Sequence, residues 1–170
     1  MALHEQSVGG SDEWYTPEHV FKAMGCNFDM DVASPGHTLT PWIPAAKFIT
    51  SESLAHEWRG FIWMNPPFGR RNGLAPWLEK FVRHSDGVCL VPDRTSAPWW
   101  QEWMPQMDLI LQVSGKIHFV PGNGQPSGSP AQGTTLGALG DRGVYALYKA
   151  EYNGLGSLWR RSAPSWFRPI

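Results

Sequence analysis

The sequence predicts an α/β fold in which helices cover both faces of a largely parallel sheet, giving a three-layer sandwich. Apolar stretches at 61–64 and 87–91 have the length and composition of buried strands. Stretches at 75–84 and 98–104 carry apolar residues at helical spacing. Strands that alternate with helices are typical of parallel sheets. A chain of 170 residues, 42% of them hydrophobic, is long enough for one such core.

Composition limits the classes of function. The formal net charge is -1, so a DNA-binding role would need a local basic patch. The 10 Trp residues exceed ordinary usage, and exposed ones would offer stacking surfaces. Cys26 and Cys89 are isolated thiols and the histidines lack ligand spacing, so we expect no metal. No apolar run could span a membrane and no signal peptide is visible, which predicts a cytoplasmic protein.

The first helix is predicted to begin near residue 17. Thr16 can cap it, Pro17 fits its first position, and Gly25 ends it. Trp14 and Tyr15 then stand at an exposed helix N-terminus, where they could line a cofactor pocket. A capped helix without a function explains the same pattern.

A strand is predicted at 28–33, where apolar and acidic residues alternate. An acid at the carboxyl end of a strand can hydrogen-bond a ribose hydroxyl, and Asp31 is better placed for this than Asp29. A surface strand with solvated carboxylates explains these residues equally well. A further short strand is predicted at 48–50.

The apolar strand at 61–64 ends abruptly in Asn65, Pro66 and Pro67. Both prolines have a fixed φ and no N–H, so the sheet ladder cannot continue through them. The turn presents the Asn65 amide, backbone carbonyls and the Phe68 ring at the end of the sheet where ligands bind. An amide oxygen and a carbonyl can accept both hydrogens of an amino group, while an aromatic ring stacks on the base that carries it. On these residues alone, a strand that merely ends in a Pro-Pro loop stays open.

The second half of the chain continues the alternation. Ser96 can cap the helix at 98–104, and a strand follows at 108–113. Residues 121–140 are rich in Gly, Ser and Pro without apolar periodicity, which predicts a mobile loop. A last strand is predicted at 143–148.

The chain is predicted to form one domain, residues 11–150, between a flexible leader at 1–10 and a C-terminal tail at 151–170. Local basic residues are the candidates for DNA contact, although ordinary solvated charge is the simpler explanation for any one of them. They are Arg70, Arg71, Asn72, Arg94 and the Trp159-Arg160-Arg161 segment.

Several motifs occur in a fixed order between residues 12 and 148. They are Asp12-Glu13-Trp14-Tyr15-Thr16-Pro17, Phe28-Asp29-Met30-Asp31-Val32-Ala33, Trp58-Arg59-Gly60, Asn65-Pro66-Pro67-Phe68, Val91-Pro92-Asp93-Arg94-Thr95, Trp99-Trp100 and Gly115-Lys116-Ile117-His118-Phe119. In this order they resemble the small phage-type DNA N-6-adenine methyltransferases. The combination is far more specific than the Pro-Pro turn alone.

The resemblance implies an abridged Rossmann-like class I methyltransferase sheet, S-adenosylmethionine as the cofactor, and duplex DNA with a flipped adenine as the substrate. It implies catalytic roles for Asn65, Pro66, Pro67 and Phe68. It implies cofactor binding by Trp14, Tyr15, Thr16, Pro17, Asp29, Asp31 and Asn65. It implies DNA contacts by Phe68, Arg70, Arg71, Asn72, Arg94 and Lys116.

The sequence departs from larger adenine methyltransferases in the cofactor half. It lacks their glycine-rich loop, and only 36 positions separate Asp29 from Asn65 (65 − 29). Phe68 stands where tyrosine is commoner and Lys116 where arginine is expected; Phe68 keeps the stacking face. No separate target-recognition domain is visible, so specificity would come from short loops, the 121–140 segment, a second subunit of a homodimer or another protein.

Two other functions stay open at this point. An Asn-Pro-Pro turn can also hold a protein glutamine side chain or an RNA amino group for methylation. The fold could also serve as a non-catalytic nucleic-acid-binding module, but the loss of Asn65 or Asp31 that would mark such a module is not seen.

Overall fold

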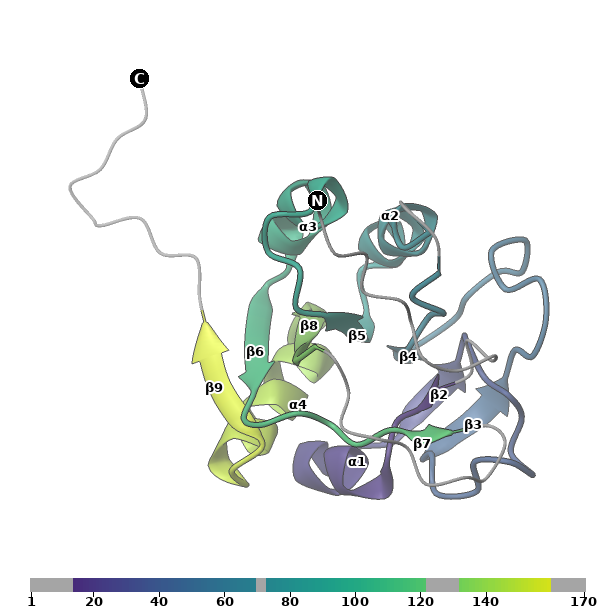
Figure 1. Cartoon of the computed structure of the whole chain (residues 1–170). Coiled ribbons are helices and arrows are strands. Elements are labelled where there is room, and N and C mark those ends of the chain that lie inside the picture. Colours follow the sequence, from purple (N-terminus) through teal and green to yellow (C-terminus); the bar gives the residue numbers. More distant parts are fainter. Residues whose placement is uncertain (1–13, 70–72, 122–131, 160–170) are drawn as a thin grey trace.

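The computed structural model describes residues 14–69, 73–121 and 132–159. It is a mixed α/β structure with a seven-stranded sheet (Figure 1). From edge to edge the strands are β3 (Ala45–Phe48), β2 (Phe28–Asp31), β4 (Ile62–Met64), β5 (Gly87–Pro92), β8 (Thr134–Leu139), β6 (Leu109–Val113) and β9 (Gly156–Trp159). A separate pair joins β1 (Trp14–Tyr15) to β7 (Val120–Pro121). The helices are α1 (Glu18–Met24), α2 (Ala75–His84), α3 (Pro98–Trp103), the 3-10 turn η1 (Met104–Gln106) and α4 (Gly140–Tyr152).

Helices cover both faces of the sheet, as the sequence predicts. In Figure 1, α2 and α3 lie on one face, and α1 and α4 lie on the other. Each pair seals its own apolar cluster: Leu78 and Trp99 belong to the cluster under α2 and α3, and Phe21 and Leu147 belong to the opposite one. The short strands β4 and β5 are buried on both faces, which explains their continuous apolar sequences.

Half of the sheet is parallel and half is antiparallel, so the expectation of a largely parallel sheet is wrong. The ladders β2–β3, β2–β4 and β4–β5 are parallel, whereas β8 runs antiparallel to both β5 and β6, and β9 is antiparallel to β6. The reason is β8, a strand absent from the sequence prediction, which inserts between β5 and β6.

The prediction of a loop over 121–140 is wrong for its described part at 132–140, because β8 occupies 134–139. All six residues of β8 are buried, so its two faces show no apolar–polar alternation. Small residues serve close packing here: a Cβ on Gly137 would lie 3.0 Å from Cys89 Sγ. The remaining part, 122–131, lies outside the described residues.

The last strand predicted at 143–148 is helical, because α4 spans Gly140–Tyr152. Its buried residues Gly143, Ala146, Leu147 and Ala150 follow helical spacing. Nor is 151–170 simply a tail, since α4 runs to Tyr152 and β9 adds an edge strand to the sheet. Residues 160–170 and the predicted leader at 1–10 lie outside the described residues.

Elsewhere the sequence located the elements well but misplaced their ends. The predicted bounds of α2 are confirmed, and β5 is one residue longer than predicted. The strand predicted at 48–50 lies instead at Ala45–Phe48. Neither Thr16 nor Ser96 caps a helix: the cap positions are Pro17 and Ala97, without side-chain hydrogen bonds. Gly25 ends α1, as predicted. No helix among the described residues is long and apolar enough to cross a membrane.

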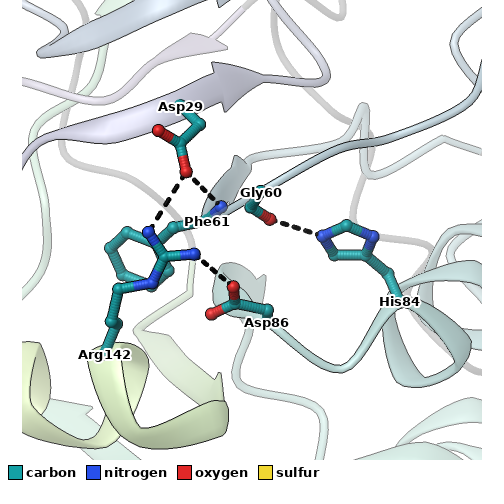
Figure 2. Close-up of polar contacts among 6 residues, drawn as sticks. All are labelled: Asp29, Gly60, Phe61, His84, Asp86 and Arg142. Carbon is teal, nitrogen blue, oxygen red and sulfur yellow. Dashed lines mark hydrogen bonds and ion pairs between the residues drawn. The ribbon is translucent and has the colours of Figure 1, made fainter.

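The amino ends of β2, β4 and β5 are held together by an arginine on α4 (Figure 2). Arg142 donates hydrogen bonds to Asp29 Oδ2 at 3.2 Å and to Asp86 Oδ2 at 2.5 Å. Asp29 Oδ2 also accepts the Phe61 N–H at 2.7 Å. These bonds join the helix to the amino ends of three strands, whereas the Asn65 turn lies at the carboxyl ends.

Gly60 is the tightest point of this cluster. Its φ is +72°, and a Cβ there would lie 2.4 Å from Asp29 Oδ2. Gly115 has the same φ of +72° but no described atom within 4 Å of its Cβ position. Alanine substitutions at the two glycines therefore separate two contributions to the loss of stability: the unfavourable backbone conformation, which both share, and the steric clash, which only Gly60 has.

We predict that Gly60→Ala destabilises the protein more than Gly115→Ala. Both variants carry the cost of about 1–2 kcal/mol for an L-residue at positive φ. Only Gly60→Ala must also displace Asp29, which adds about 1–3 kcal/mol of overpacking. Chemical denaturation of the two variants and the wild type measures the difference. Equal destabilisation would show that Asp29 moves away at no cost.

Candidate functional site

The centre of the parallel region is a topological switch point between β2 and β4. From β2 the chain continues to β3 on one side, and then returns to β4 on the other side and proceeds outward to β5. The connections that follow β2 and β4 thus leave in opposite directions, which opens a crevice at their carboxyl ends. Ligands of open α/β sheets bind in such crevices.

A cavity of about 780 Å³ lies at this point. Its volume is in the range of pockets that bind small molecules and cofactors. The described part of the wall comes from β1, the loops after β2 and β3, the turn after β4, and α2. The lining residues are Trp14, Tyr15, Val32, Ala33, Ser34, Pro35, Leu39, Ile49, Thr50, Ser51, Glu52, Ser53, Leu54, Ala55, Asn65, Pro66, Pro67, Phe68 and Trp77.

The Asn65 amide is fixed by the N-terminal segment. Asn65 Nδ2 donates one hydrogen bond to the Trp14 carbonyl oxygen at 2.9 Å and a second to Thr16 Oγ1 at 3.1 Å. A carbonyl only accepts, so the atom that faces Trp14 must be the amide nitrogen. Both N–H groups are therefore used within the protein. Among the described residues, no group donates a hydrogen bond to the remaining amide oxygen, Oδ1.

The ring of Phe68 is held by the strand pair β1–β7. Phe119, which directly precedes β7, packs edge-to-face against Phe68, with ring centroids 6.3 Å apart and an interplanar angle of 83°. Phe68 is half-buried and lies on the cavity wall. Trp14 and Tyr15 pair with Pro121 and Val120, so the same short ribbon reaches both ends of the Asn65–Phe68 turn.

Asp31 is buried with only 1% exposure, and it does not line the cavity. Its Oδ1 accepts the Ala33 N–H at 3.2 Å, which shapes the loop at Val32–Pro35 on the cavity wall. Burial raises the pKa of Asp31 to about 6, although hydrogen bonds from Ala33 and Ser34 oppose the shift. The structure thus gives Asp31 a place behind the wall rather than on it.

Asp29 does not belong to this group. It lies at the amino end of the sheet, where Phe61 N–H and Arg142 hold the pKa of its carboxyl below the usual value. The sequence ranked Asp31 above Asp29 for a ribose contact, and the two acids lie near opposite ends of the four-residue strand β2. We withdraw Asp29 from the candidate cofactor residues.

The loop after β3 was missed by sequence reasoning. Glu52 lies on the cavity wall, exposed, with a φ of +48° that is rare for a residue other than glycine. Backbone strain of this kind gathers at functional sites. The available signal was an acid shortly after the carboxyl end of a strand, four residues beyond β3, but a ribose contact was considered only for the strand that contains Asp31.

A lysine on α2 secures the turn that follows Glu52. Lys80 Nζ donates to the carbonyl oxygens of Ser53 at 3.0 Å, Leu54 at 2.9 Å and His56. Trp58 Nε1 also donates to Ser53, and the buried indole packs beneath Lys80. The part of the cavity wall formed by the loop after β3 is therefore held in place by α2.

The remaining candidates are scattered. Thr16 is buried and, like Pro17, does not line the cavity. Arg94 is exposed and donates to Gln132 Oε1 at 3.0 Å; Lys116 is also exposed. Arg70, Arg71 and Asn72 lie outside the described residues. Within the described part of the chain, no three His, Cys, Asp or Glu side chains gather as metal ligands would.

Comparison with known proteins identifies one family. The family model of DNA N-6-adenine-methyltransferase (Dam) matches residues 5–138, which is most of the chain. The match covers the described part of the cavity wall, from Trp14 to Trp77. No individual curated protein and no solved structure matches the chain.

The buried carboxyl of Asp31 predicts a pH-dependent difference in stability between the wild type and Asp31→Asn. A folded-state pKa raised from 3.8 to about 6 means that Asp31 favours folding below pH 4 and that this contribution is lost as the pH rises through 6. The shift corresponds to roughly 3 kcal/mol. Asparagine keeps an acceptor for the Ala33 N–H without the charge. The free energy of unfolding of Asp31→Asn relative to wild type should therefore rise by roughly this amount between pH 4 and pH 7.

Denaturation of both proteins across this pH range measures the effect, because other titrating groups cancel in the difference. Asp31→Ala is the control for the lost hydrogen bond. A difference that does not change with pH would contradict the raised pKa.

Proposed function

The chain belongs to the DNA N-6-adenine-methyltransferase (Dam) family, and on that premise we propose that it transfers the methyl group of S-adenosylmethionine to the exocyclic amino nitrogen of adenine in duplex DNA. The observation that carries this proposal is the Asn65 amide, whose two N–H groups are bound to Trp14 and Thr16. The amide oxygen is then the group left for the substrate, and adenine offers a matching amino donor.

The turn supplies two acceptors for that amino group. Asn65 Oδ1 accepts one amino hydrogen and the Pro66 carbonyl accepts the other. These bonds draw the nitrogen lone pair out of conjugation with the ring and direct it at the methyl carbon. When bound, S-adenosylmethionine would supply an electrophilic methyl group on a sulfonium, whose sulfur would become a neutral thioether after the transfer. As the N–C bond forms and the S–C bond breaks, the amino group becomes cationic, and its surplus proton passes to solvent afterwards.

Phe68 provides the stacking face for the flipped base. Extrusion of adenine from the duplex costs roughly a few kcal/mol, and stacking on an aromatic ring recovers roughly 1–3 kcal/mol. The contact with Phe119 fixes the ring before the base arrives. Most of the acceleration then comes from holding the nitrogen and the methyl carbon in a reactive geometry.

The cavity also fits the cofactor. Its volume of about 780 Å³ and its place at a switch point suit a nucleoside-sized ligand beside a base. We assign the ribose to the carboxylate of Glu52, because it is the acid on the described wall, while Asp31 shapes the neighbouring loop after β2. Trp14 and Tyr15 remain cofactor candidates, since both line the cavity. The β3-β2-β4-β5 order supports the abridged Rossmann-like reading of the sheet.

The proposal predicts different defects for two variants of the turn. Asn65→Ala removes a hydrogen bond that strengthens as the amino nitrogen becomes tetrahedral. Its methylation rate should fall roughly a hundredfold or more, while cofactor affinity stays near wild type. Phe68→Ala removes the stacking face, so DNA affinity and rate should both fall, and Phe68→Tyr should restore most of each.

Transfer of a labelled methyl group to unmethylated duplex DNA, followed by nucleoside analysis, measures both effects. Asn65→Ala activity close to wild type would remove Asn65 from the reaction. A wild-type protein that methylates only a protein glutamine or an RNA amino group would favour the alternative substrates over DNA.

A further inference from the structure

The orientation of the Asn65 amide depends on two acceptors that lie far away in sequence. An asparagine amide turns about a broad, roughly two-fold torsion, so packing alone seldom decides which end faces a substrate. Here the Trp14 carbonyl binds one N–H at 2.9 Å and Thr16 Oγ1 binds at 3.1 Å. Two acceptors for two N–H groups define the plane of the amide as well as its direction.

Thr16 is itself held rigidly. It is 1% exposed and lies between β1, which pairs with β7, and the first turn of α1. Its carbonyl oxygen accepts the Trp42 indole N–H at 2.9 Å. The hydroxyl is thereby fixed relative to the end of β4, although it caps no helix and lines no part of the cavity.

We propose that Thr16 is a positioning residue for the methyl-transfer reaction: its hydroxyl oxygen locks the Asn65 amide with Oδ1 toward the substrate amino group. Without that acceptor, a single hydrogen bond to the Trp14 carbonyl is left, so the amide can swing about this bond and move Oδ1 out of line with the amino group. The assignment differs from cofactor binding by Thr16, which the family resemblance implied. It rests on the proposed function only for its effect on the reaction, since the orientation of the amide can be observed directly.

The test compares Thr16→Val with Thr16→Ser. Valine keeps the branched shape and removes the acceptor, whereas serine keeps the acceptor. With asparagine labelled in ¹⁵N and the Asn65 signals assigned by their loss in Asn65→Ala, NMR reports solvent exchange and rotation of the amide hydrogens. We expect slow exchange in the wild type and Thr16→Ser, and at least a tenfold increase in Thr16→Val.

The kinetic arm uses single-turnover methylation of duplex DNA. Thr16→Val should lower the rate about tenfold with cofactor and DNA dissociation constants within about twofold of wild type, and Thr16→Ser should recover most of the rate. In an Asn65→Ala background, Thr16→Val should cause no further loss, because the amide it positions is gone.

Two results would overturn the proposal: unchanged Asn65 amide exchange in Thr16→Val, or an equal rate loss with and without Asn65. The first is measured whether or not DNA is the substrate. A wild type that methylates no adenine in DNA but shows the expected amide exchange would therefore overturn the proposed function and support the positioning of Asn65 by Thr16.

Discussion

The missing N–H groups of Pro66 and Pro67 end β4 beside the switch point of the sheet, and the site depends on this ending. Had the ladder continued, the Asn65 amide would lie within a sheet instead of at its edge. Because the strand stops, Asn65 can reach the Trp14 carbonyl and Thr16. Phe68 can pack against Phe119 from the other end of the same turn. Two segments from opposite parts of the chain thus converge on four residues.

The amino and carboxyl ends of the parallel strands differ in their contacts. At the amino edge, Arg142 ties α4 to Asp29 and Asp86, and Gly60 leaves room for that contact (Figure 2). At the carboxyl ends of the strands, the turn after β4 and the loops after β2 and β3 line an open cavity, and Lys80 holds the loop after β3. The contacts of Arg142 fix the amino ends of the parallel strands. The carboxyl ends can therefore border a ligand cavity while the register of the strands stays fixed.

The sequence predicted those parts whose local pattern is unambiguous. The amphipathic spacing of 75–84 and the Pro-Pro ending of β4 each follow from rules that act within a few residues. β8 was missed because a strand buried on both faces and rich in small residues has no alternation to detect. The roles proposed for Thr16 and Glu52 were missed for a different reason. Each depends on a contact or a cavity formed by distant segments, which no local spacing reports.

A crystal structure of the protein with S-adenosylhomocysteine tests the central claim most directly, namely that the cavity beside Asn65 is the cofactor site. We expect the thioether next to the Asn65–Phe68 turn, the ribose hydroxyls within hydrogen-bonding distance of Glu52, and the Asn65 amide still bound to Trp14 and Thr16. The ligand in another place, such as the smaller cavity beside α1 at Phe21 and Trp42, or an Asn65 amide released from Trp14, would contradict the account.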